Sequence, residues 1–151
     1  MRIERLDIYG YGKWVDTTFD LSKDVHLFYG MNEAGKSTLM SFMHSILFGF
    51  PTRNSALLRY EPRESSRYGG RITATDPRFG EVIIERTHGK VTGNVTVTLE
   101  DGTTGKDELL ETILHGMTRE SFQHIFSFSL TDIEQVHKLN KNQLSRYLLN
   151  I

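Results

Sequence analysis

The chain has 151 residues, a formal net charge of −1 and no cysteine. Its 38% hydrophobic and 25% charged residues are typical of a single globular domain and exclude a disordered or membrane-embedded chain. Without thiols there are no disulfides, thiolate zinc sites or cysteine nucleophiles. The start Met1-Arg2-Ile3-Glu4 lacks the apolar stretch of a signal peptide, and no apolar run has the length of a membrane span. We therefore expect a cytoplasmic protein without a membrane partner.

The first third of the chain predicts three strands. Arg2 to Tyr9 alternates apolar and charged residues until the turn Gly10-Tyr11-Gly12, and Val15 to Leu21 is a second short strand. Val25 to Tyr29 is almost continuously apolar, as in a strand that is buried on both faces.

A glycine-rich segment follows this apolar run directly. Residues Gly30 to Thr38 satisfy the pattern G-x-x-x-x-G-K-[ST] and then open a helix, which is the context that a phosphate-binding loop requires. Gly49 and Pro51 predict the end of that helix. Its apolar positions fall at helical spacing: Leu39, Met40, Phe42, Met43, Ile46 and Leu47.

The loop predicts a site for ATP with Mg²⁺. Backbone N–H groups and the positive end of the helix dipole bind phosphate oxygens. Lys36 is expected to reach the β- and γ-phosphates, Ser37 to ligate Mg²⁺ and Thr38 to lie near the α-phosphate. The nucleotide-binding residues predicted from the sequence are Gly30, Met31, Asn32, Glu33, Ala34, Gly35, Lys36, Ser37 and Thr38.

Residues 51 to 70 have no apolar periodicity and read as an exposed, arginine-rich loop. Two interpretations stay open. The segment either contacts DNA phosphates, with Tyr60 and Tyr68 interleaved among the arginines, or is a solvated insertion or a surface that meets another subunit. The arginines of this segment and its border are Arg53, Arg59, Arg63, Arg67 and Arg71.

Residues 71 to 105 predict an antiparallel meander. Its strands are expected at Arg71 to Thr75, Glu81 to Thr87 and Asn94 to Leu99, with turns between them. Val82 to Glu85 superficially resembles a Walker B strand that ends in a carboxylate, but its place in the meander favours a plain strand.

Residues 106 to 151 predict a mainly helical part. Helices are expected at Asp107 to His115, which Gly116 ends, and at Thr118 to about Phe126. A capping box at Thr131 to Glu134 opens a last helix. The chain ends at Ile151 without a stop signal, so we expect further sequence beyond it. In this division of the chain, residues 1 to 50 hold the first strands, the loop and the first helix.

The loop resembles the G-x-N-E-x-G-K-S-T loop of the SbcC-like and YhaN-like ATPases, with Asn32-Glu33 as its most specific part. These are ABC-type heads, related to SMC proteins and to the DNA double-strand-break repair ATPases. The resemblance runs from the strand ending in Gly10-Tyr11-Gly12-Lys13 to Phe126-Ser127-Phe128-Ser129-Leu130. It implies an α/β P-loop NTPase fold, namely the N-terminal lobe of such a head, with an antiparallel β subdomain and a coiled coil to follow.

Two further site residues come from this resemblance. Lys13 matches the place where such heads touch the nucleotide, although a lone lysine in a turn is more often merely solvated. The family's Q-loop glutamine, which meets Mg²⁺ and the attacking water, is replaced by Ser129, and Gln123 lies too early. Ser129 is therefore a candidate metal contact through water.

The resemblance implies an ATPase that couples ATP binding and hydrolysis to DNA processing or repair. Its expected partners are the C-terminal lobe of the same protein, a second head in an ATP-dependent dimer, and a nuclease and DNA in the full assembly. This chain alone is expected to bind ATP and hardly to hydrolyse it. Two alternatives stay open: a small P-loop kinase and a nucleotide-binding structural module without catalysis.

Overall fold

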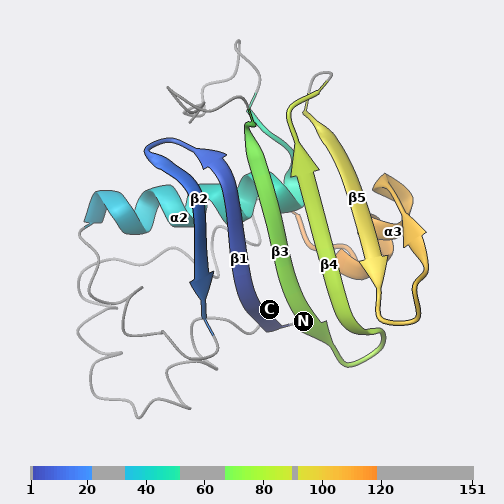
Figure 1. Ribbon diagram of the computed structural model, residues 1–151. Helices are drawn as coiled ribbons and strands as arrows, with labels where there is room; N and C mark the ends of the chain where they lie inside the picture. The colour runs from blue at the N-terminus through green and yellow to red at the C-terminus, as the bar shows by residue number, and fades with distance from the viewer. Residues whose placement is uncertain (1, 22–32, 52–66, 90–91, 119–151) are drawn as a thin grey trace.

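The computed structural model describes residues 2–21, 33–51, 67–89 and 92–118. In this part of the chain, six strands form one antiparallel sheet in the order β2-β1-β3-β4-β5-β6. Figure 1 shows α2 crossing one face of the sheet, with α3 beside β5 and β6. The elements are β1 (Arg2–Tyr11), β2 (Trp14–Asp20), α2 (Glu33–Phe48), β3 (Gly69–Asp76), β4 (Gly80–Thr87), β5 (Asn94–Leu99), β6 (Thr104–Gly105) and α3 (Asp107–Leu114).

Strand β1 is longer than the sequence predicted and does not alternate regularly. Its buried apolar residues are Ile3, Leu6, Ile8 and Tyr11, which are spaced by three, two and three positions. Register shifts against β3 interrupt the pairing after Ile3 and after Ile8. Each irregularity adds one residue and turns the next apolar side chain back to the core. The turn predicted at residues 10–12 lies instead at Gly12 and Lys13, because Gly10 and Tyr11 still belong to the strand.

The predicted meander is confirmed in β3, β4 and β5. Continuous antiparallel pairing joins β3 to β4 and β4 to β5. At the first turn the Asp76 carboxylate accepts a hydrogen bond from the Arg78 backbone N–H at 2.7 Å, and Gly80 has a φ of 72°. Strand β6 has only two residues and was not predicted, since so short a segment carries no periodicity.

The apolar face of α2 packs on the sheet, as the helical spacing predicted. Leu39, Phe42 and Ile46 are fully buried, together with Ile72 of β3 and Ile84 of β4. Gly70 of β3 permits this approach: a Cβ there would lie 2.7 Å from the Phe42 ring and would also clash with the Asp7 carbonyl oxygen. The close contact between helix and sheet therefore depends on a residue without a side chain.

The C-terminus of α2 ends as predicted at Gly49, which has a φ of 106° and whose N–H donates to the Ser45 carbonyl at 2.8 Å. Arg86 of β4 is 3% exposed and donates from Nε to the Ile46 carbonyl at 3.0 Å. A cation at this end also interacts favourably with the helix dipole. Helix α2 is thus fixed to the sheet at its C-terminal end.

Helix α3 ends one residue before the predicted boundary. His115 adopts the left-handed conformation, with a φ of 50°, and its N–H donates to the Glu111 carbonyl at 3.0 Å. Gly116 follows with a φ of 81°. The predicted strand at 25–29, most of the arginine-rich loop and the helices after 118 lie outside the described residues. The antiparallel β part of the predicted fold is confirmed, and the α/β P-loop arrangement stays a prediction.

Candidate functional site

Helix α2 begins inside the predicted phosphate loop. It starts at Glu33, so the last six residues of the motif form its first turns. Gly30, Met31 and Asn32 lie outside the described residues, as do the side chains of Glu33 and Ala34. A helix N-terminus carries partial positive charge and directs backbone N–H groups outward, so this end of α2 is suited to anions.

The described side chains of the motif lie on different sides of α2. Gly35 is buried, four residues before the buried Leu39, and belongs to the face that packs on the sheet. Lys36 and Thr38 are half-buried and Ser37 is exposed. Since each residue advances the helix by about 100°, Ser37 points away from the packed face. The motif thus has its glycine buried and its Ser37 hydroxyl nearer to solvent.

A buried hydroxyl cluster joins β1 to α2 behind these residues. The Tyr11 hydroxyl lies 2.7 Å from Oγ of Ser41 and 3.0 Å from Oγ of Ser45. Ser37, Ser41 and Ser45 are four residues apart, and each lies about 40° further round the helix than the one before. Ser45 is buried, Ser41 is half-buried and Ser37 is exposed. Sequence reasoning missed this contact, although an aromatic residue ending a strand and a serine every four residues along a helix were its visible signals.

Lys13 lies in the turn that follows Tyr11. Its side chain is exposed, and Nζ is 6.0 Å from the centroid of the Trp14 ring. Trp14 is the direct cross-strand partner of Tyr11, so both side chains lie on the sheet face that α2 covers. The structure thus places Lys13 on the hairpin that contacts α2.

The predicted metal contact through Ser129 lies outside the described residues, as does Gln123. Within the described ranges, no group of three or more His, Cys, Asp or Glu side chains is arranged to hold a metal ion. Ser37 is the only predicted metal ligand that the structure describes.

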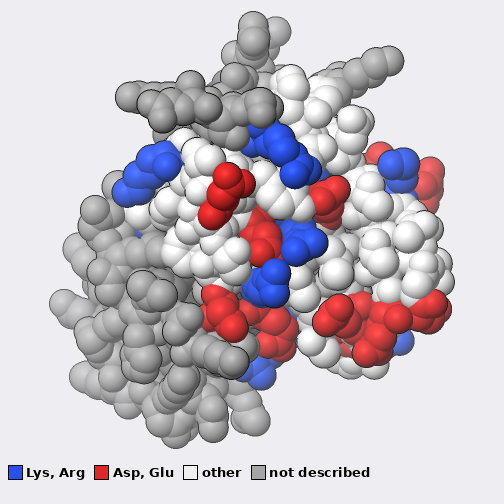
Figure 2. Space-filling model, viewed as in Figure 1, with Lys and Arg blue, Asp and Glu red and all other residues white. Residues whose placement is uncertain are grey.

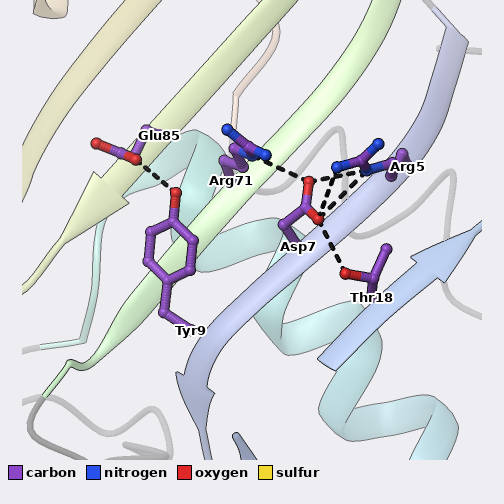
Figure 3. A network of polar contacts seen from close by, with 6 residues as sticks. All are labelled: Arg5, Asp7, Tyr9, Thr18, Arg71 and Glu85. Atoms are coloured by element: carbon purple, nitrogen blue, oxygen red, sulfur yellow. Dashed lines mark hydrogen bonds and ion pairs between the residues drawn. The ribbon is translucent and has the colours of Figure 1, made fainter. Parts of the chain in front are cut away.

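The opposite face of the sheet carries a row of polar side chains (Figure 3). Thr18, Asp7, Arg71 and Glu85 lie opposite one another on β2, β1, β3 and β4. The Asp7 carboxylate accepts hydrogen bonds from Arg71 at 3.0 Å, from Thr18 at 3.0 Å and from Arg5 at 3.1 to 3.2 Å. This row lies away from α2 and belongs to a different surface from the phosphate motif.

These contacts shift two pKa values in opposite directions. Burial raises the pKa of Asp7, but the hydrogen bonds from Arg5, Arg71 and Thr18 outweigh it and leave the pKa below its ordinary value of 3.8. Burial and the hydrogen bond that the Tyr9 hydroxyl donates to Glu85 raise the pKa of Tyr9 to about 12. Asp7 is thus held as a carboxylate and Tyr9 as a neutral phenol.

Glu85 ends the segment that resembled a Walker B strand. Its carboxylate accepts the hydrogen bond from Tyr9 on the face opposite α2, and β4 lies between two antiparallel neighbours. The interpretation of Val82 to Glu85 as a plain strand is therefore confirmed.

The arginine-rich surface is only partly described, and of its two tyrosines the described one, Tyr68, does not fit contact with DNA. Tyr68 is 4% exposed and its ring stacks on Phe50 at 4.3 Å, so it offers no face to a base. Arg71 pairs with Asp7, and Arg67 lies 4.1 Å from the Tyr9 ring centroid. Figure 2 shows acidic and basic side chains interleaved on this face. Arg53, Arg59, Tyr60 and Arg63 lie outside the described residues.

Comparisons with known proteins decide the family. A family model described as an AAA domain matches residues 1–143. The chain belongs to the AAA domain family. A relative from Bacillus subtilis (strain 168), named "Uncharacterized protein YhaN", is 38% identical over 150 residues, which is 99% of this chain and 15% of the relative. No solved structure matches the chain.

Membership of the AAA domain family suggests a nucleotide-binding ATPase function, in agreement with the phosphate motif at the start of α2. The chain spans about 15% of the length of the curated relative that it matches. Within the described residues, no helix is long and apolar enough to cross a membrane.

Proposed function

We propose that this chain binds ATP with Mg²⁺ through residues 30–38. The observation that carries the proposal is the start of α2 inside the motif, with Gly35 buried, Lys36 half-buried and Ser37 exposed. The side chains have the chemistry for the ligand: an ammonium group matches the β- and γ-phosphates, and a hydroxyl oxygen is a ligand that Mg²⁺ accepts. Thr38 would lie near the α-phosphate.

We also propose that the chain alone hydrolyses ATP hardly at all. Hydrolysis needs a group that orients water and groups that stabilise charge on the departing phosphate. Glu85, the carboxylate that resembled a Walker B residue, hydrogen-bonds Tyr9 on the sheet face away from α2. The missing groups would come from the C-terminal lobe of the same protein and from a second head.

The proposed role of the full protein is that of an SMC-like or SbcC-like ATPase. ATP binding would bring two heads together and move coiled coils, a nuclease partner or DNA in a cytoplasmic assembly. The relative named YhaN is much longer than this chain, which leaves room in that protein for such parts. This role rests on the resemblance of the loop around Asn32-Glu33, not on a described contact.

The alternative of a small P-loop kinase has less support. Such kinases continue from the phosphate-loop helix into a parallel strand, whereas β3, the next described strand after α2, pairs antiparallel with β1 and β4. A nucleotide-binding structural module remains the alternative if no assembly restores hydrolysis.

The proposal is tested by titrating ATP into the protein with Mg²⁺ and with EDTA. We expect one bound nucleotide per chain and tighter binding with Mg²⁺, and we expect Ser37→Ala to remove most of that difference. Thr112→Ala is the matched control, since it removes an exposed hydroxyl from α3. Absence of binding under both conditions would refute the proposal, and an unchanged Mg²⁺ effect in Ser37→Ala would refute the role of Ser37.

A further inference from the structure

The Tyr11 side chain carries a hydroxyl that packing alone does not need. Its ring is fully buried and makes a T-shaped contact with Phe42 at 5.4 Å and a stacked contact with Tyr68 at 5.9 Å. A phenylalanine ring would make the same contacts. The hydroxyl adds the bonds to Ser41 and Ser45, and Ser45 is itself 1% exposed. Buried hydroxyl groups cost free energy unless they are paired, so such a cluster favours one relative position of strand and helix.

The cluster lies close to the phosphate motif along α2. Ser41 is four residues after Ser37, which is about 6 Å along a helix axis. On the strand side, Tyr11 is the last residue of β1 and is two residues before Lys13. One hydrogen bond therefore connects the turn that carries Lys13 to α2 about one turn after Ser37.

Trp14 is held by the same hairpin. It pairs with Tyr11 across the strands, and its ring packs against Phe19 at 5.3 Å in a T-shaped contact. The side chain is half-buried, and it is the only tryptophan of the chain. Its fluorescence therefore reports on the hairpin.

We propose that Tyr11 is a positioning residue of the nucleotide site: its hydrogen bond to Ser41 holds the Gly12-Lys13 turn in place, so that Lys13 reaches the nucleotide bound at α2. This inference rests on the proposed nucleotide binding. Tyr11 itself does not touch the ligand, because its hydroxyl is buried between the strand and the helix. Its effect on affinity therefore passes through Lys13.

The test is a double-mutant cycle on Mg·ATP affinity with Tyr11→Phe, Lys13→Ala and the double variant. We expect each single change to weaken binding by about three- to tenfold, and the double variant to be no weaker than Lys13→Ala. A purely structural tyrosine would give effects that add. Ser41→Ala should behave like Tyr11→Phe, and Ser41→Thr, which keeps the hydroxyl, should restore the affinity.

Trp14 fluorescence supplies a second readout. Mg·ATP should change the emission of the wild type, and Tyr11→Phe and Ser41→Ala should reduce the change at saturating nucleotide. Thr17→Ala is the control, since it removes a hairpin hydroxyl that donates to the Val15 carbonyl of the same strand. Thermal unfolding of every variant tests whether it is folded at the temperature of the titration.

The outcomes separate the two proposals. If the wild type does not bind Mg·ATP, both the proposed function and this inference are overturned. If the wild type binds and Lys36→Ala does not, the function stands. In that case, Tyr11→Phe with wild-type affinity, or effects of Tyr11→Phe and Lys13→Ala that add, would overturn the positioning role alone.

Discussion

The Nε atom of Arg86 lies 3.0 Å from the carbonyl oxygen of Ile46. One atom belongs to the middle of the sheet and the other to the last turns of α2, and the arginine is 3% exposed. A further bond of 3.4 Å runs from the same guanidinium to the Thr92 carbonyl. The bond between Arg86 and Ile46 and the contact between Tyr11 and Ser41 thus fix α2 to the sheet at two places.

Replacing Arg86 by methionine should therefore destabilise the domain. The change leaves the Ile46 carbonyl without this donor in a buried place, and we expect a loss of about 1–3 kcal/mol in the free energy of unfolding. Urea unfolding followed by circular dichroism measures it. Arg2→Met, a half-exposed arginine of β1, is the control and should change stability by no more than about 0.5 kcal/mol. Equal effects of the two changes would contradict the role of Arg86.

Acid should weaken the fold through Asp7. Its pKa is lowered in the folded state, so its contribution to stability is complete above the ordinary value of 3.8 and is lost as the pH falls through the folded pKa. We expect Asp7→Asn to cost about 1 kcal/mol near neutral pH, a modest figure because Arg5 and Arg71 are partly exposed.

The measurement for Asp7 is the slope of unfolding free energy against pH below about 4. The slope should be flatter in Asp7→Asn than in the wild type. Glu81→Gln, an exposed carboxylate of β4, is the control and should keep the wild-type slope. An Asp7→Asn variant with an unchanged slope would show that the carboxylate does not stabilise the fold.

Sequence periodicity predicted most of the described fold because the patterns are strong where one face is buried. The apolar residues from Leu39 to Leu47 recur at helical spacing and predict a helix, and the alternation around Ile84 predicts a strand. The irregular strand β1 was harder, since its two register shifts depend on pairing with β3 and not on local sequence. The burial of Tyr68 was missed for the same reason: its ring is covered by Phe50 and Tyr11, which are distant in sequence.

The residues of the candidate site follow from the motif alone, and their binding of nucleotide stays a prediction. The motif at 30–38 defines ligand chemistry through residue identity and spacing, whereas α2 starts earlier than the apolar spacing predicted, at Glu33 inside the motif. The hydroxyl cluster behind it needs three residues from two elements to meet in space. No local pattern indicates that the end of β1 lies against the third and fourth turns of α2.

The isolated chain should release phosphate from ATP very slowly. We expect turnover far below about one per second, since the water-orienting and charge-stabilising groups are proposed to come from other parts of the assembly. A phosphate-release assay measures it, and Lys36→Ala identifies a contaminating ATPase. Sustained turnover at about one per second that disappears in Lys36→Ala would show that this chain is a complete enzyme.

The most direct test of nucleotide binding is calorimetric titration of Mg·ATP into the wild type, Lys36→Ala and Lys106→Ala. Lys106 is the control, because it is an exposed lysine before α3, away from the motif. Loss of hydrogen bonds from a charged group should cost Lys36→Ala about 1.5–3 kcal/mol, or about 10- to 150-fold in affinity. Lys106→Ala should bind as the wild type does. Equal affinities in all three proteins, or no heat of binding in the wild type, would contradict a nucleotide site at the start of α2.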